Sequence, residues 1–328
     1  MHLSIKFQAN LIILVALLLQ TSAFAHHGGT SVSQGSGTPI ETNTPITLPK
    51  GTGVVFTRTE FVNFREFESE EPFNVDSFRF YQLGASFGLT DSLMATIIAP
   101  YNSKSQDNVG TIRGFGDLQF QLNLGFNYDS VDGFGLNQSE DLGLEFGGTD
   151  KWYFGAFGGL TVPTGSTERD LGLGIDPGQQ PGFGSVSGTL GLSAQKALSK
   201  KFNLIADTSV QLFTPQSGGN KFGNEFRGNL AGVYNLYSNP DSLFRQWDTS
   251  LELNYLKLSR DESAGISEFG TGGDILYVTP GTRIQLNNFN LGAGIRIPIA
   301  RSLNEVNLQQ GAEGLENYRL IFTGSFAF

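Results

Sequence analysis

The chain has 328 residues, a formal net charge of −10, 43 Gly, 28 Phe and no Cys. The acidic balance excludes nucleic-acid binding through basic patches. The lack of Cys excludes disulfides, thiolate metal sites and the lipid anchor of bacterial lipoproteins. Only 16% of the residues are charged, and no window shows the periodicity of an amphipathic helix, so an all-β fold is expected.

The N-terminus carries the pattern of an export signal. Lys6 precedes an apolar run from Leu11 to Leu19, and Ala23-Phe24-Ala25 offers a small-residue cleavage motif. This pattern predicts a secretory signal peptide over residues 1–25, removed after export. Residues 26–50 are small, polar and rich in Pro, Gly and Thr, which predicts an extended lead-in without a core of its own.

From Gly51 onward, segments of alternating apolar and polar residues recur. The clearest is DLQFQLNLGFNY at 117–128, in which Leu, Phe and Tyr alternate with Gln and Asn. Period-two alternation indicates a strand with two unlike faces, and about 9–11 residues cross a bilayer at a tilt. We expect the Leu/Phe/Tyr side to face lipid and the polar side to face an interior. Twelve such segments lie near 53–66, 76–89, 92–103, 116–128, 151–163, 185–197, 202–214, 223–237, 246–258, 274–287, 289–300 and 317–328.

The connections between these segments sort by length. Tight turns are expected at Thr90-Asp91, Ser199-Lys200 and Asn287-Asn288, with a slightly longer one at 238–245. Long connections are expected at one end of the array, near 67–75, 104–115, 164–184, 215–222, 259–273 and 301–316. The exception is 129–150, either an excursion on the turn side or a place where LGLEFGG at 142–148 adds strand structure.

This layout predicts a transmembrane up-and-down antiparallel β-barrel of about 12 strands over residues 51–328. Closure is expected because an open sheet edge in hydrocarbon would leave backbone donors unpaired. The protein is therefore expected in the outer membrane of a Gram-negative-type envelope, in contact with lipid. Residues 26–50 then have two interpretations that stay open, a plug folded into the lumen or a free periplasmic tail.

The last segment, NYRLIFTGSFAF, ends on an aromatic residue. It resembles the C-terminal signal read by the outer-membrane assembly machinery, with Tyr318, Phe322, Phe326 and Phe328 at even steps. That machinery is therefore an expected partner.

Several motifs carry a family resemblance. They are GLTDSL at 88–93, IAPY at 98–101, GFGDLQF at 114–120, LTVPTGS at 160–166, TPGTRI at 279–284, LGAGIRIPIA at 291–300 and the C-terminal YRLIFTGSFAF. In this order they resemble the outer-membrane family named for the meta pathway of phenol degradation. The resemblance implies a barrel for the uptake of hydrophobic or aromatic compounds, similar to long-chain fatty-acid transporters.

Polar residues on the inward phase of the strands are the candidate lumen lining. They are Gln119, Gln121, Asn123, Asp207, Gln211, Glu225, Arg227, Glu252, Asn254, Arg283, Arg296 and Arg319. The alternative is that they only fill the barrel, as Arg paired with Asp or Glu. Twelve strands lie between barrels of about 8 strands that side chains fill and porins of about 16 that enclose a channel. Passage is therefore expected to need a gap or a moving segment.

Three prolines fall near the external ends of strands, namely Pro100, Pro163 and Pro298. Proline removes a donor from the hydrogen-bond ladder. Either each strand simply stops there, or the prolines mark a lateral opening through which an apolar solute leaves into the membrane.

No enzyme and no cofactor are expected. His26 and His27 lie outside the barrel sequence, so the barrel lacks a histidine general base. After cleavage these two residues could chelate Cu or Zn, but a polar leader is favoured and no metal centre is predicted.

The resulting prediction is passive uptake of small hydrophobic or aromatic solutes across an outer membrane. The alternatives are a non-transport envelope protein, structural or ligand-binding through its external loops, and a narrow pore for polar solutes.

Overall fold

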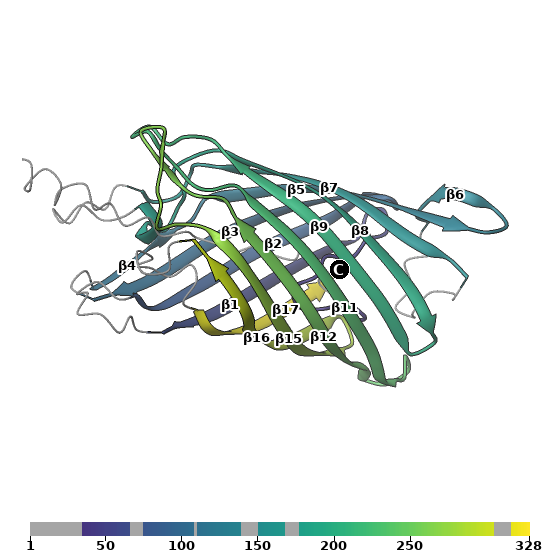
Figure 1. Ribbon diagram of the computed structural model, residues 1–328. Coiled ribbons are helices and arrows are strands. Elements are labelled where there is room, and N and C mark those ends of the chain that lie inside the picture. Colours follow the sequence, from purple (N-terminus) through teal and green to yellow (C-terminus); the bar gives the residue numbers. More distant parts are fainter. Residues whose placement is uncertain (1–34, 66–74, 108–109, 139–149, 168–176, 305–315) are drawn as a thin grey trace, which may run out of the picture.

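The computed structural model describes residues 35–65, 75–107, 110–138, 150–167, 177–304 and 316–328. Twelve tilted strands form the barrel wall within this described part (Figure 1). They are β1 (Gly53–Phe64), β2 (Val75–Thr90), β3 (Leu93–Gln106), β5 (Leu118–Asp129), β7 (Trp152–Val162), β8 (Ser187–Ser199), β9 (Phe202–Phe213), β11 (Glu225–Ser238), β12 (Phe244–Leu258), β15 (Gly273–Leu286), β16 (Phe289–Leu303) and β17 (Glu316–Ala327). Each pairs antiparallel with its neighbours in chain order, and β1 pairs with β17 to close the sheet. The predicted up-and-down barrel is confirmed. Among the described residues, no helix is long and apolar enough to cross a bilayer.

The two ends of the barrel differ. Short turns join β2 to β3, β8 to β9 and β15 to β16 at one end, called the turn end below. The other end, the loop end, carries a small three-stranded sheet of β10 (Asn220–Lys221), β13 (Glu262–Ser263) and β14 (Ile266–Ser267).

Two connections differ from expectation. The predicted loop over 104–115 is wrong, because β3 continues to Gln106 and pairs with β4 (Gly110–Phe115). The backbone of this hairpin pairs as in any strand. Its residues, however, do not alternate between apolar and polar, so the sequence pattern predicted a loop. In the 129–150 connection, β6 (Gly133–Leu136) pairs with the end of β5. This is added strand structure on the turn side, whereas 142–148 lies outside the described residues.

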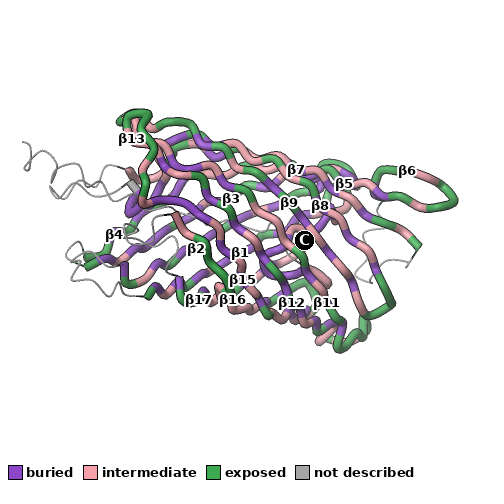
Figure 2. The backbone as a smooth tube through the Cα atoms, viewed as in Figure 1, coloured by how far each residue is buried: buried purple, intermediate pink, exposed green. Residues whose placement is uncertain are grey.

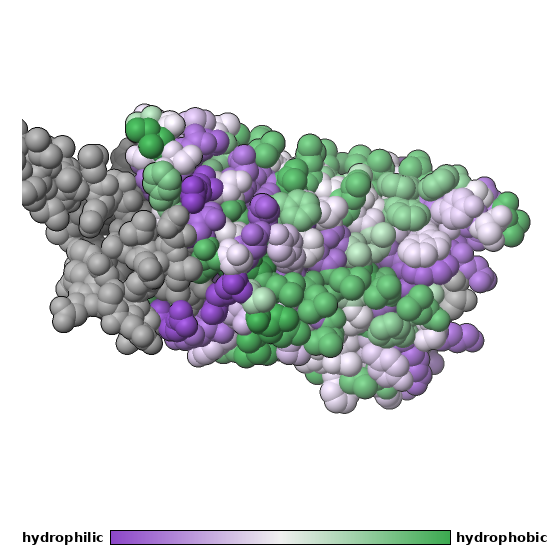
Figure 3. All heavy atoms as spheres, viewed as in Figure 1, coloured by the Kyte–Doolittle hydropathy of each residue, from purple (hydrophilic) through white to green (hydrophobic). Residues whose placement is uncertain are grey.

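The wall has an apolar outer face and a polar inner one. Along β5, Leu122 is 53% exposed on the outside whereas Asn123 is 6% exposed and points inward. Buried and exposed residues alternate in the same way along the other strands (Figure 2). Hydrophobic side chains gather over the middle of the visible face, with hydrophilic ones toward the loop end (Figure 3). This distribution is typical of a barrel surrounded by lipid.

The interior is unlike a soluble core. Arg58, Lys104, Glu60 and Glu252 are among the largest fully buried side chains. Charged groups of this kind are rarely buried unless they are paired, so their partners define what fills the barrel.

Candidate functional site

Residues 35–50, called the lumen segment, lie inside the barrel as a loop that enters and leaves at the turn end. Near its start, Ser36 donates a hydrogen bond of 2.6 Å to Gln285, beside the β15–β16 turn. Near its end, Thr47 donates one of 2.6 Å to the carbonyl oxygen of Asp91, in the β2–β3 turn. Between them the chain reaches the middle of the barrel, where Ile40 is 0% exposed.

A carboxylate of the wall holds the apex of the lumen segment. Glu252 accepts hydrogen bonds from the backbone N–H groups of Ile40 (2.6 Å), Glu41 (3.1 Å) and Thr42 (2.8 Å). The Thr42 hydroxyl donates a further bond of 2.7 Å. Because four donor groups of the segment bind this one side chain, Glu252 is a main anchor of the segment.

Arginines of the wall hold the same apex through its acceptors. Arg58 donates 2.9 Å to the carbonyl of Ile40, and Arg283 donates 2.8 Å to the carbonyl of Pro39. Glu41 is ion-paired with Arg58, and its other carboxylate oxygen lies 3.5 Å from Arg296 Nη1. The apex is therefore bound through both its donors and its acceptors.

Inward-facing glycines make room for the lumen segment. A Cβ built at Gly155 would lie 2.9 Å from Cα of Pro45, and one at Gly125 would lie 2.8 Å from its carbonyl oxygen. A Cβ at Gly281 would lie 2.5 Å from Cγ1 of Ile40. Because Cβ atoms do not approach backbone this closely, the wall sequence is matched to the segment at these points.

A second piece of chain lies against the inner face of β3. This inward segment, Pro177–Phe183, begins with the short helix η2 (Pro177–Gln179). Lys104 Nζ donates to the carbonyls of Gly178 (3.1 Å) and Gln180 (2.8 Å). Asn102 Nδ2 donates 2.6 Å to the carbonyl of Pro181. Side chains of β3 therefore hold the segment through its backbone oxygens.

The regular ladder is interrupted beside this segment. The β5–β7 pairing begins at Leu118, opposite Val162, and in the described part of the chain β4 pairs with β3 alone. At the junction of β4 and β5, Gly116 donates 2.9 Å to the carbonyl of Pro100. Pro163 directly follows β7. Pro100 and Pro163 thus flank a gap in the ladder between β4 and the end of β7. This gap is called the wall interruption below.

Asp117 bridges the wall interruption. It is 3% exposed and accepts hydrogen bonds from the backbone N–H groups of Gly165 (2.8 Å) and Phe183 (2.6 Å). A cavity of about 30 Å³ adjoins it, lined by Phe80, Gln82, Pro100, Asn102, Asp117, Gln119, Pro181, Gly182 and Phe183. The wall is closed here by a few irregular bonds rather than by a full ladder.

Pro298 lies at a different irregularity. The β15–β16 register shifts where Tyr277 faces Pro298, and the β16–β17 pairing ends at Arg296. Beyond that point Arg301 donates to the carbonyl of Glu316.

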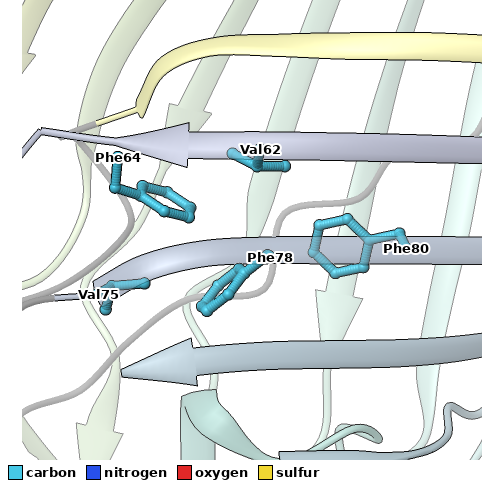
Figure 4. Packing of buried hydrophobic residues seen from close by; sticks show 5 residues of the cluster. All are labelled: Val62, Phe64, Val75, Phe78 and Phe80. Carbon is cyan, nitrogen blue, oxygen red and sulfur yellow. The ribbon is translucent and has the colours of Figure 1, made fainter. Parts of the chain in front are cut away.

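The loop end of the interior contains an apolar cluster. Val62, Phe64, Val75, Phe78 and Phe80 pack together on the inner faces of β1 and β2 (Figure 4). The Phe64 and Phe78 ring centroids are 4.9 Å apart, and those of Phe78 and Phe80 are 6.0 Å apart, both edge to face. These five residues are called the vestibule cluster. The neighbouring wall carries a second inward apolar group of Leu256, Leu258, Ile275 and Tyr277.

All twelve polar residues assigned to the interior lie on the inward phase. The buried ones are Asn123, Asp207, Glu225, Glu252, Asn254, Arg283, Arg296 and Arg319, and the half-buried ones are Gln119, Gln121, Gln211 and Arg227. Ion pairing joins Arg227 to Glu225, and Arg319 to Glu60 (2.7 Å) and Glu316 (2.9 Å).

Sequence reasoning missed Arg58, Glu60, Glu41, Glu316 and Lys104. Arg58 and Glu60 share the inward face of β1 with Val and Phe residues, so neither face of that strand looked polar. In the sequence, Arg58 and Glu60 alternate with Thr57 and Thr59. This short polar run was the only sign that charged residues lie on the inward face.

The remaining predicted sites are at the chain ends. His26 and His27 lie outside the described residues, and the described part contains no group of three or more His, Cys, Asp or Glu that could hold a metal ion. Tyr318 and Phe322 are 40% and 49% exposed on the outer face. Phe326 is half-buried, and its ring lies 4.8 Å from that of Phe289. Phe328 exchanges two backbone hydrogen bonds of 2.9 Å with Gly53.

Solved structures similar to this one are outer-membrane barrels. The COG4313 outer membrane channel from Pseudomonas putida F1 matches with a TM-score of 0.62 and 14% identity, over 88% of this chain and 100% of that chain. The NanC porin matches with a TM-score of 0.45 and 8% identity, over 83% of this chain and 98% of that chain. The TodX monoaromatic hydrocarbon channel, as its deltaS2 mutant, matches with a TM-score of 0.37 and 12% identity, over 87% of this chain and 92% of that chain. The first likeness shows a shared fold.

No curated protein sequence matches the chain. A family model described as "Putative MetA-pathway of phenol degradation" matches residues 36–312. This match confirms the resemblance seen in the motifs. The chain belongs to the family of the putative MetA pathway of phenol degradation.

Proposed function

We propose that the protein is a channel for passive uptake of small hydrophobic compounds, aromatic ones included, across an outer membrane. The observation that carries this proposal is the vestibule cluster. Barrel interiors are usually polar, yet here five apolar side chains line the interior at the loop end. A solute that leaves water for such a surface gains about 25 cal/mol per Å² of apolar area buried. The family description, which concerns the degradation of an aromatic compound, agrees with such a cargo.

The route straight through the barrel is unfavourable for an apolar solute. The lumen segment fills the middle, and we propose that it acts as a plug. It is surrounded by buried, hydrogen-bonded side chains such as Arg58, Glu252 and Arg283. Separating such groups from their partners costs several kcal/mol, and an apolar molecule cannot replace the lost hydrogen bonds.

The wall interruption offers a sideways route. It lies next to Phe80 of the vestibule cluster, as the residues around the 30 Å³ cavity indicate. Opening it requires the loss of the two bonds to Asp117 and of the bonds from Ser166 to Phe115 and from Leu118 to Thr164, rather than of a regular ladder. The solute would then pass from the vestibule into the membrane, driven by its own concentration gradient. Pro298 is not part of this route, because it lies on β16 opposite Tyr277 of β15, away from β4, β5 and β7.

We propose roles for the two chain ends in export and assembly. We propose that residues 1–25 are removed after export. We propose also that the assembly machinery recognises Tyr318, Phe322, Phe326 and Phe328 before the barrel closes. In the finished barrel Tyr318, Phe322 and Phe326 lie on β17. Phe328 directly follows β17 and forms backbone hydrogen bonds with Gly53.

The direct test is initial uptake of radiolabelled toluene by cells that lack the protein, by complemented cells and by two variants. Phe78→Gln combined with Phe80→Gln makes the vestibule cluster polar. Phe134→Gln changes a residue that is 74% exposed on β6, at the turn end. We expect the deletion and the double variant to slow uptake several-fold and Phe134→Gln to leave it unchanged. Equal uptake by deletion and complemented cells would refute the proposed function.

A further inference from the structure

Two arginines and a serine form a row on the outer surface of β2, β3 and β4, near the loop end (Figure 1). The register places Arg79 of β2 opposite Ser103 of β3, and Ser103 opposite Arg113 of β4. Both arginines are exposed, while Ser103 between them is 8% exposed. Side chains alternate between the two faces of a strand, and the adjacent row, which is buried on the inner face, consists of Phe78, Lys104 and Ile112. Arg79, Ser103 and Arg113 are called the arginine row.

A row of aromatic side chains lies next to the arginine row, one step closer to the turn end. Tyr81, Tyr101 and Phe115 are aligned on the same three strands, and all are exposed. The ring centroids of Tyr101 and Phe115 are 5.5 Å apart, edge to face. Aromatic girdles mark the membrane interfaces of outer-membrane barrels, so hydrocarbon ends near these rings. The arginine row lies about 7 Å further along the strands, at the depth of the lipid headgroups.

The two arginines lack acidic partners among the residues that the structure describes. Neither forms an ion pair or a side-chain hydrogen bond with any of those residues. Asp76, near the end of β2, instead accepts a hydrogen bond of 3.2 Å from the Ser105 hydroxyl. Because only β3 separates their strands, the backbones of Arg79 and Arg113 are about 10 Å apart. Two long cationic side chains at this spacing can converge on one anion.

We infer that the arginine row binds a phosphate group of a lipid in the outer leaflet, and that this lipid is a glycolipid carrying phosphate monoesters. Guanidinium groups bind phosphate through paired N–H donors, and the Ser103 hydroxyl adds a further donor. A phosphate monoester has a charge of about −1.5 to −2 at neutral pH, which suits two arginines better than the single charge of a phospholipid diester does. The inference goes beyond the proposed uptake function, which does not depend on it.

The outer wall below the aromatic row suits the hydrocarbon chains of the same lipid. Leu83 and Ile97 are 61% and 42% exposed there, on the outward phase of β2 and β3. Long loops face outward in barrels with short periplasmic turns, so the loop end meets the external leaflet. Polar, aromatic and apolar residues thus follow one another along the wall in the order of phosphate, headgroup boundary and chains.

The bound lipid would also brace the wall interruption. Within the described part of the chain β4 pairs with β3 alone, so one edge of the hairpin has no ladder. A phosphate held by both Arg79 and Arg113 links β4 to β2 across β3. We therefore expect the lipid to hold the β3–β4 hairpin against the rest of the wall.

The test measures binding of diphosphoryl lipid A to the purified full chain in detergent, by native mass spectrometry over a series of lipid concentrations. The same lipid with both phosphates removed, phosphatidylglycerol, and an excess of inorganic phosphate as competitor are compared with it. The variants are Arg79→Gln, Arg113→Gln, the two combined, and Lys257→Gln. Lys257 is the matched control, since it is exposed near the loop end of β12 but lies between Phe226 and Asp274 in the ladder. Heat-modifiable migration on gels verifies folding, and Ala replaces Gln in a variant that does not fold.

We expect wild type and Lys257→Gln to bind diphosphoryl lipid A with Kd values within about twofold of each other. Each Arg→Gln change should weaken binding about tenfold, as the loss of a charge-assisted hydrogen bond predicts, and the double variant should bind more weakly than either. Wild type should bind the dephosphorylated lipid and phosphatidylglycerol about tenfold more weakly. Inorganic phosphate should not displace the lipid, because it has no hydrocarbon chains.

Unchanged affinity in the double variant would overturn the inference. So would equal affinity of wild type for the dephosphorylated lipid or for phosphatidylglycerol, or displacement of the lipid by inorganic phosphate. Toluene uptake is measured separately in cells. Its dependence on the protein tests the proposed function alone, so failure of the lipid site and failure of the uptake function are distinguished.

Discussion

Glu252 and Ile40, far apart in sequence, meet in the middle of the barrel through a 2.6 Å hydrogen bond from the Ile40 backbone nitrogen to Glu252 Oε1. Both residues are 0% exposed. The contact fixes the apex of the lumen segment to β12, where the same carboxylate also binds the next two backbone nitrogens. Glu252 is thus one main anchor of the segment, beside Arg58 and Arg283.

Glu252→Ala should loosen the lumen segment without unfolding the barrel. Each backbone donor left unpaired costs about 1–3 kcal/mol, so states with the segment displaced become more populated. Single-channel conductance in planar bilayers should rise above that of wild type. Leu253→Ala is the control, because Leu253 is the next residue and is 44% exposed on the outer face. The same conductance in Glu252→Ala and Leu253→Ala would contradict the anchoring role.

Gly155→Val should displace the lumen segment by a different means. A Cβ at Gly155 would lie 2.9 Å from Cα of Pro45, whereas one at Gly158, on the outer face of the same strand, would meet nothing closer than 3.5 Å. Gly155→Val is therefore expected to raise conductance, and Gly158→Val to leave it at the wild-type level. If both variants fold and have equal conductance, the position of the lumen segment does not depend on a glycine at residue 155.

Leu122→Arg should block assembly, while Gln121→Arg is tolerated. A charge on the lipid face costs about 2–4 kcal/mol near the bilayer midplane, and one on the lumen side keeps polar neighbours. Leu122 is 53% exposed on the outer face, and Gln121 is half-buried on the inner one. The fraction of folded protein in outer membranes, read from heat-modifiable migration, should be low for the first variant alone. Equal yields would contradict the assigned faces.

Strand number, order and faces followed from the sequence because lipid imposes period-two alternation on every strand that crosses it. DLQFQLNLGFNY is a clear case, since its outer face is almost wholly apolar and its inner face polar. The hairpin of β3 and β4 was missed because beyond the apolar band nothing requires alternation, although the backbone still pairs.

The candidate site was less predictable, for two reasons. Inward arginines and acids such as Arg283 and Glu252 could be assigned to the interior by their phase. Their partners in the lumen segment depend on how a Pro-rich chain folds back, which no periodicity encodes. Lys104 was placed in a loop, so its position opposite Phe78 could not be foreseen.

Removal of Phe328 should lower insertion more than it lowers the stability of the finished barrel. Its two backbone hydrogen bonds to Gly53 contribute about 0.5–1.5 kcal/mol each, a small part of a twelve-strand ladder. The recovery of folded protein from outer membranes should fall sharply, while the unfolding temperature of the recovered fraction stays near that of wild type. Full recovery of the truncated chain would show that the assembly machinery does not need this residue.

The sideways route is tested most directly by locking the wall interruption. A Cβ at Gly114 would lie 3.1 Å from Cβ of Ser166, so a shift of a few tenths of an ångström reaches the separation of about 3.5–4.5 Å in a disulfide, and the chain has no Cys of its own. Gly114→Cys with Ser166→Cys therefore forms the lock. Ser86→Cys with Thr96→Cys, at a facing pair of the intact β2–β3 ladder, is the control. Toluene uptake by the oxidised lock should fall to the level of the deletion strain and recover on reduction, while the control pair transports equally in both states. Uptake by the oxidised lock as fast as by its reduced form would contradict the sideways route.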